Sequence, residues 1–244
     1  MKRIFALLVM LSLASVATAG EVFIPATYRG EGAEGSLWRT EIVVTNLSTY
    51  PVVDPVQATI TLHIPGVLPM SVPMLLSTNE VVAVPDALFN WWGVVSGGGL
   101  VRISWDDPNA RITARARIYN VSSGGEFGQG VPSFRLHELE SSAYLPGLSG
   151  VNGNRTNIGI VNPHPYDIIA WVEMIDTAGV GRGMFATEVK ARSFKQLNDI
   201  FAHFQAGPMS ASMVRVSSSN ATIYAYASIV RDDTGDATFV TPAR

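Results

Sequence analysis

The side chains best suited to bind a partner are arginines and tyrosines that occupy alternate positions of two segments. In residues 111–119 and 223–229, the intervening positions hold mainly Ile and Ala. Such alternation predicts strands with one wet face. Arg and Tyr are enriched in binding surfaces because each offers a large contact area with directed hydrogen bonds. The hypothesis is an outward binding face whose members are Arg111, Arg115, Arg117, Tyr119, Tyr224 and Tyr226.

The arginines of this face indicate the chemistry of a partner. A guanidinium pairs bidentately with carboxylate or sulfate groups, and a tyrosine ring can stack on the face of a sugar. An acidic glycan or a surface protein outside the cell is therefore the expected partner. Trp91 and Trp92 either extend a sugar-stacking surface or are buried in the core. The competing interpretation is that the arginine row only protects a strand edge from aggregation.

Neighbouring carboxylates are the remaining option for catalysis. Glycoside hydrolysis needs two carboxyl groups about 5–10 Å apart. The local candidates are Glu31 with Glu34, Asp106 with Asp107, and Glu138 with Glu140. The sequence does not give the separation of any pair. We favour a protein without catalytic activity. A secreted carbohydrate-active enzyme therefore stays open as the alternative.

Most other chemistries are excluded or disfavoured by residue types and spacing. The chain has no Cys, which excludes disulfides, thiolate metal sites and cysteine nucleophiles. Its four histidines, His63, His137, His164 and His203, do not stand at metal-ligand spacings. The Asp-rich segment 231–236 lacks the spacing of a calcium loop and is interpreted as a hairpin turn. We expect no cofactor, no metal ion and no catalytic residue.

Two Asp and two Arg residues recur at matching places in the two halves of the chain. Asp86 and Asp199 each precede a short predicted helix and are interpreted as N-caps. Arg39 and Arg155 each stand at the start of a predicted strand, after a Gly-containing loop. We expect each arginine to hold that loop by hydrogen bonds.

The elements that position these residues follow from an internal repeat. The run RTEIVVTN at 39–46 matches RTNIGIVN at 155–162, and shorter matches keep the same order along the chain. The predicted organisation is a signal peptide at 1–19, one domain at 20–130, a linker at 131–141 and a second domain at 142–244.

Each repeat combines strand periodicity with frequent turns. Polar and apolar residues alternate, and clusters of Gly, Pro, Asp and Asn separate the runs. Helix signals are limited to the segments 86–91 and 199–204. The sequence therefore predicts an all-β chain of two tandem, antiparallel, immunoglobulin-like β-sandwich repeats with at most one short helix each.

The segments RTEIVVTNLS and RTNIGIVNPHP, the latter followed by a strand ending IDTAG, resemble the opening of bacterial secreted immunoglobulin-like repeats. Those modules are similar to the cell-adhesion-related domains of bacterial surface proteins. The resemblance covers both repeats and implies a spacer, adhesion unit or accessory module. It supplies no catalytic residue to carry over.

The first 20 residues indicate export. Lys2 and Arg3 precede an apolar run that is too short to span a bilayer, and Ala17-Thr18-Ala19 provides a cleavage site before Gly20. Loss of the two basic residues changes the formal net charge from −3 to −5, which argues against nucleic acid as a partner. We expect a secreted or periplasmic, non-catalytic binding, adhesion or structural module without a membrane span. A subunit of an extracellular assembly is a further alternative, and the oligomeric state stays open.

Overall fold

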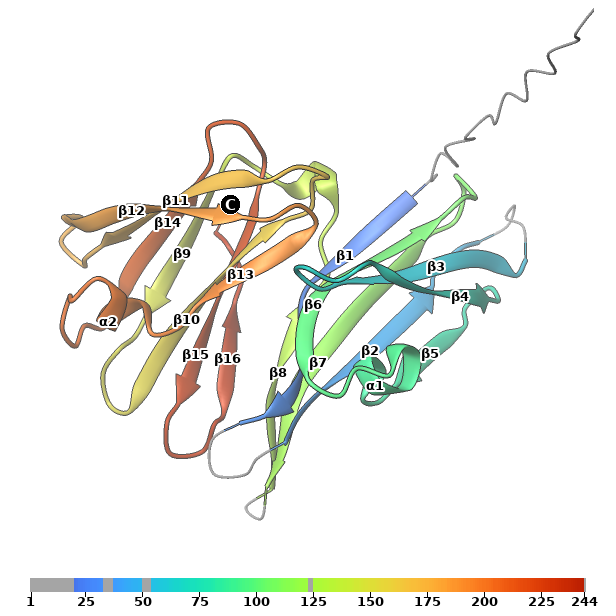
Figure 1. Ribbon diagram of the computed structural model, residues 1–244, viewed down its shortest axis with the longest axis horizontal. Helices are drawn as coiled ribbons and strands as arrows, with labels where there is room; N and C mark the ends of the chain where they lie inside the picture. Colours follow the sequence, from blue (N-terminus) through green and yellow to red (C-terminus); the bar gives the residue numbers. More distant parts are fainter. Residues whose placement is uncertain (1–19, 33–36, 50–53, 123–124, 244) are drawn as a thin grey trace, which may run out of the picture.

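The computed structural model describes residues 20–32, 37–49, 54–122 and 125–243. The expected signal peptide at 1–19 and Glu34 lie outside these residues. These residues fold almost entirely into antiparallel strands, with two short α-helices (Figure 1). The all-β prediction is confirmed. No helix among the described residues is long and apolar enough to cross a membrane.

The described residues of the first half form eight strands and one α-helix. Period-two patterning places their apolar side chains on one face of each strand. The elements are β1 (Gly20–Glu31), β2 (Leu37–Asn46), β3 (Val56–His63), β4 (Met70–Leu76), β5 (Val81–Val84), α1 (Ala87–Trp92), β6 (Gly97–Trp105), β7 (Ile112–Ser122) and β8 (Gly125–Pro132).

The second half begins after a short 3₁₀-helix, η2 (Leu136–Glu138). It also contains eight strands and one helix. They are β9 (Ser142–Leu148), β10 (Asn154–Asn162), β11 (Ile168–Ile175), β12 (Gly181–Val189), β13 (Ser193–Leu197), α2 (Ile200–His203), β14 (Ser212–Ser217), β15 (Tyr224–Arg231) and β16 (Ala237–Val240).

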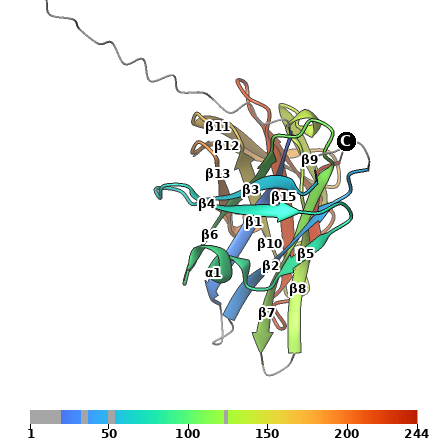
Figure 2. The ribbon, with the colours of Figure 1, turned by 90° about the vertical axis from the view of Figure 1, so that its right-hand side faces the viewer.

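Both halves have the same strand order. The first half has the layers β4-β3-β6-β1 and β5-β2-β7-β8, joined where the end of β1 pairs with the start of β2. The second half has the sheets β12-β11-β14-β9 and β13-β10-β15-β16. Figure 2 shows β3 and β4 running across the direction of β2, β7 and β8. The immunoglobulin-like part of the prediction is not confirmed. In the second half the first two strands, β9 and β10, lie in different sheets, whereas that fold places its first two strands side by side in one sheet.

Each half has its own apolar core between its two layers. In β7, Ile112, Ala114, Ala116 and Ile118 face inward and are buried, as their alternation predicts. A second cluster fills the other sandwich and includes Ile158, Val172 and Val214. The run 39–46 lies in β2 and the run 155–162 in β10, so both are strands, as expected.

The two halves pack through the outer face of β13-β10-β15-β16, which covers part of the first half. Phe23 of β1 stacks on Phe134 with ring centroids 5.4 Å apart, and Phe134 stacks on Tyr224 of β15 at 4.4 Å. Tyr224 and Tyr226 thereby join the core cluster of the first half. Both tyrosines lie on the outer face of β15, as the alternation predicts, but the first half covers this face, so they are buried and not exposed to a partner.

A cleft between the two halves

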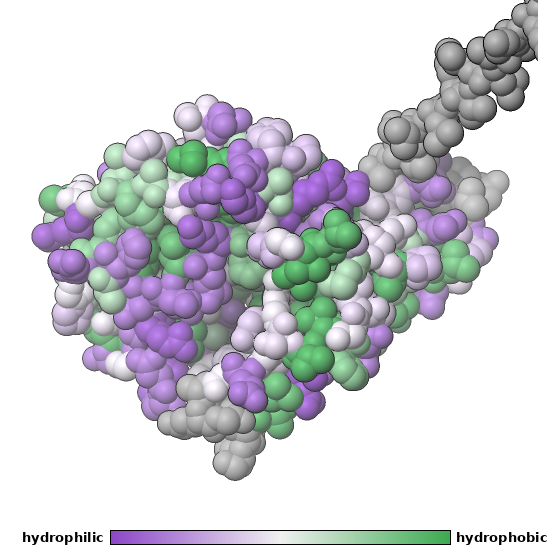
Figure 3. Space-filling view, in the orientation of Figure 1, coloured by the Kyte–Doolittle hydropathy of each residue, from purple (hydrophilic) through white to green (hydrophobic). Residues whose placement is uncertain are grey.

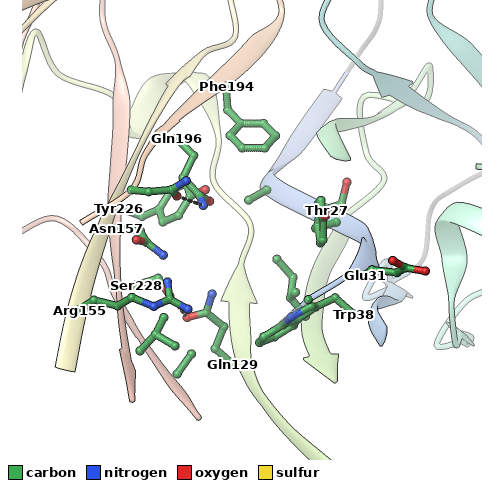
Figure 4. Close-up of a pocket in the computed structure, with 17 residues that line it drawn as sticks. Thr27, Glu31, Trp38, Gln129, Arg155, Asn157, Phe194, Gln196, Tyr226 and Ser228 are labelled. Atoms are coloured by element: carbon green, nitrogen blue, oxygen red, sulfur yellow. Dashed lines mark hydrogen bonds between the residues drawn. The ribbon is translucent and has the colours of Figure 1, made fainter. Parts of the chain in front are cut away.

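The candidate site is a cleft with a volume of about 440 Å³ between the two halves. The space-filling view is hollowed there, and the close-up shows one wall from each half (Figures 3 and 4). The first half contributes residues of β1, β2, β7 and β8, and the second contributes residues of β10, β13, β15 and β16.

The lining of this cleft combines aromatic rings with side-chain amides. Amides donate and accept hydrogen bonds at the same time, which suits groups such as hydroxyls that also do both. Aromatic rings offer flat apolar surface. The rings are those of Tyr28, Trp38, Phe194 and Tyr226, and the amides are those of Gln129, Asn157, Gln196 and Asn198.

Tyr226 forms part of the wall and is held rigidly. Its ring lies on Gly159 of β10, where a Cβ would come within 2.0 Å of the ring, and it stacks on Phe239 at 4.8 Å. Tyr226 is only 2% exposed, and its hydroxyl has no hydrogen-bond partner among the described residues. Burial raises the pKa of this phenol above its usual range, so the hydroxyl keeps its proton. A buried polar group without a partner costs stability. A ligand atom that accepts a hydrogen bond from this hydroxyl would remove the cost.

Two contacts hold the walls of the cleft at a defined spacing. Ser228 of the second half donates a hydrogen bond to Gln129 of the first at 2.9 Å. At Gly235, in the turn between β15 and β16, a Cβ would lie 3.0 Å from the Asn120 side-chain nitrogen. The hairpin of the second half therefore touches the end of the first half beside Trp38.

One cation and one anion belong to the described lining. They are Arg155 on the second half and Glu31 on the first. Arg155 donates through Nε to Asp232 at 3.0 Å. The expectation that Arg155 holds its preceding loop is therefore corrected, because the Asp-rich turn supplies the partner.

The Asp-rich segment forms the hairpin turn that was expected. Asp232 pairs with Arg155, and Asp233 pairs with Arg231 at 2.7 Å. The described residues contain no group of three or more side chains that could hold a metal ion.

The six predicted binding residues do not form one surface. Arg111 and Arg115 are exposed, whereas Arg117 is half-buried, pairs with Glu126 and lies 5.1 Å over the Tyr119 ring. Tyr119 is itself buried under this arginine. The three arginines remain on one outer face of the first half, and Tyr224 and Tyr226 lie in the contact between the halves.

The carboxylate pairs are not brought together in the cleft. Asp107 accepts a hydrogen bond from the backbone of Asn109 within its own turn, and Glu138 accepts one from the backbone of Arg135. Of the candidates that the structure describes, Glu31 lines the cleft. Its predicted partner, Glu34, lies outside the described residues.

The recurring Asp residues have different roles. Asp199 caps α2, because its side chain accepts from the Ala202 amide at 3.3 Å, as predicted. Asp86 stands at the N-cap position of α1, as predicted, but its side chain makes no capping hydrogen bond there. Its carboxylate instead accepts from Arg29 Nε at 2.9 Å, and Arg39 Nε lies 3.8 Å away. The interpretation of Arg39 as a loop anchor is corrected in the same way.

The tryptophan pair of α1 packs edge to face with ring centroids 5.3 Å apart. Trp91 and Trp92 are partly buried against the core of the first half. They lie on α1, away from the residues that line the cleft.

No protein-family model and no curated protein matches the chain. Among solved structures, it has a TM-score of 0.27 with vicilin from Corylus avellana (hazelnut), at 9% identity over 87% of this chain and 74% of vicilin. The coconut allergen cocosin gives 0.26, at 8% identity over 90% of this chain and 76% of cocosin. Both scores are below 0.5, so neither similarity carries an argument about function.

Proposed function

We propose that this chain is an exported, non-catalytic binding module that takes a saccharide unit of an extracellular glycan in the cleft between its halves. The observation that carries the proposal is the lining of aromatic rings and amides around the buried, unpartnered hydroxyl of Tyr226. A sugar presents C–H faces to rings and hydroxyls to amides. Each kind of lining group therefore has a counterpart on such a ligand.

The size of the cleft agrees with this class of ligand. Small-molecule sites have volumes of about 300–1,000 Å³ and combine apolar walls with a few directed polar groups. The volume of about 440 Å³ is at the lower part of that range and suits one or two sugar rings. Arg155 additionally provides a guanidinium for a carboxylated or sulfated ring, which agrees with an acidic glycan as the partner.

Export, a bacterial surface location and a tandem origin of the two halves belong to the same proposal. The signal-peptide pattern at 1–19 supports export, and the equal strand order of the halves supports duplication of one domain. The alternative, a carbohydrate-active enzyme, requires two carboxylates at the reacting bond. The described lining contributes one, Glu31.

The test is the binding of labelled mature protein to an array of neutral, uronic-acid and sulfated oligosaccharides. We expect retention of a subset of these probes, and Trp38→Ala should weaken it about 10-fold, the loss typical of a stacking residue. The matched control is Tyr166→Ala, which removes an exposed ring outside the cleft and should leave retention unchanged. Equal retention by both variants, or retention of no probe, would contradict the proposal.

A further inference from the structure

The second half exposes a sheet face whose counterpart on the first half is covered. Directly paired residues of β4, β3, β6 and β1 form one outward row, and paired residues of β12, β11, β14 and β9 form the equivalent row. These rows are Ser71-Thr61-Arg102-Phe23 and Met184-Glu173-Arg215-Tyr144. Phe23 is 3% exposed, whereas Tyr144 is 39% exposed. The difference arises because Phe134, which stacks on Tyr224, covers Phe23.

The uncovered face of the second half carries several large apolar side chains. Trp171 is 41% exposed, and Met184 and Ile169 of the same face are exposed as well. Between Trp171 and Tyr144 lies the ion pair of Arg215 and Glu173, with 2.8 Å between nitrogen and oxygen. Large apolar side chains that gather exposed on one sheet face indicate an interaction site. We call these residues, Tyr144, Ile169, Trp171, Glu173, Met184 and Arg215, the aromatic face.

The sheet of the second half that packs on the first half also has an equivalent in the first half, and the outer face of that equivalent sheet is not covered. In the second half, β13-β10-β15-β16 covers the first half. The equivalent strands of the first half are β5-β2-β7-β8. Their outer face presents Arg115 opposite Val43 and Arg117 opposite Glu41. We call these residues the arginine face, together with Arg111, which lies four residues before Arg115 and directly precedes β7.

The two uncovered faces are chemically complementary. Arg stacks on Trp and Tyr rings through cation–π contact, and its fork pairs with carboxylates. The aromatic face offers Trp171, Tyr144 and Glu173 to these groups. The exposed Glu188 lies at its margin, on the outward side of β12. The chain therefore carries two complementary surfaces, and a contact between them would resemble the contact between its own two sandwiches.

We propose that a second copy of this chain places its arginine face on the aromatic face of the first, in the relation that the second half of one chain has to its first half. The proposal is independent of the cleft. Because the two faces differ, the contact is heterologous, and repetition produces an open row of molecules rather than a closed pair.

Sedimentation velocity over a range of protein concentrations at low salt tests this proposal. We expect the weight-average mass of the wild type to rise with concentration beyond that of a dimer. Trp171→Ser disables one face and Arg115→Glu disables the other, so each variant alone should be a monomer. A 1:1 mixture of these two variants should form heterodimers and nothing larger, because one intact face of each kind remains.

Matched substitutions on other exposed residues, Tyr166→Ser and Arg231→Glu, should assemble as the wild type does. Tyr144→Ser provides a second way to disable the aromatic face, and circular dichroism checks that each variant is folded. A wild type that is monomeric at all concentrations would overturn the proposal. So would an assembly that survives both single-face variants, and so would a monomer that binds polysaccharide through Trp171.

Discussion

At the scale of single residues, the pair of Arg29 and Asp86 is the clearest internal electrostatic contact. Two hydrogen bonds of 2.9 and 3.1 Å join Arg29 Nε to the carboxylate, and both side chains are largely buried. Asp86→Asn leaves this guanidinium without its counter-charge, so we expect a loss of about 2 kcal/mol in the free energy of unfolding. Asp233→Asn breaks an exposed pair and is the control. Urea denaturation of both variants measures the difference, and equal midpoints would contradict this account of Asp86.

His63 of β3 gives the chain a predictable dependence on pH. Burial, together with the nearby positive charges of Arg192 and Arg102, lowers the pKa of His63 to about 4. The unfolded chain binds this proton near pH 6.5, so stability is lost as the pH falls from about 6.5 to about 4. The loss from this one group is about 3 kcal/mol at pH 4.

The measurement for His63 is the unfolding midpoint of His63→Gln and wild type between pH 4 and pH 8. The variant should show a shallower fall, because Gln does not titrate. His137→Gln removes an exposed histidine and should follow the wild-type curve. Parallel curves for His63→Gln and wild type would show that His63 is not buried in its neutral form.

At the scale of elements, the close approach of β15 to β10 sets the shape of the cleft. A Cβ at Gly159 would lie 2.0 Å from ring atoms of Tyr226. We expect Gly159→Ala to displace this ring, to lower the free energy of unfolding by about 1–3 kcal/mol, and to weaken glycan retention. Gly130→Ala in β8 meets no atom within 4 Å and serves as the control. Thermal unfolding and the oligosaccharide array together check both effects, and a silent Gly159→Ala would refute this packing.

The alternation of polar and apolar residues predicted most strands, but not which parts of the molecule pack on their outer faces. The alternation in β7 correctly indicated that Ile112 and Ile118 face inward. The segment 86–91 covers all of α1 except its last residue, Trp92, and the segment 199–204 contains α2. The same alternation in β15 placed Tyr224 and Tyr226 outward. It says which residues share a face and not what covers that face. One signal was present, because Gly159 stands where the matching run has Val43, and a small residue in a strand marks a close approach.

The cleft itself was beyond sequence reasoning for a related reason. Trp38, Gln129, Asn157 and Gln196 come from four strands of two halves, and no local spacing connects them. Only the packing of one sandwich on the other brings them together. Motifs made of adjacent residues, such as the carboxylate pairs and the Asp-rich turn, were visible in the sequence, but they serve local turns and ion pairs.

At the scale of the whole molecule, Tyr226 is the proposed ligand-binding group of the cleft between the two halves. Tyr226→Phe removes a buried hydroxyl without a partner and keeps the ring that packs on Gly159 and Phe239. Two measurements on this variant should change in opposite directions. They are its thermal stability without oligosaccharide and its retention on the oligosaccharide array. The free protein should become more stable by about 1 kcal/mol, while retention falls below that of the wild type. Unchanged retention by Tyr226→Phe together with unchanged retention by Trp38→Ala would contradict the assignment of the cleft as the binding site.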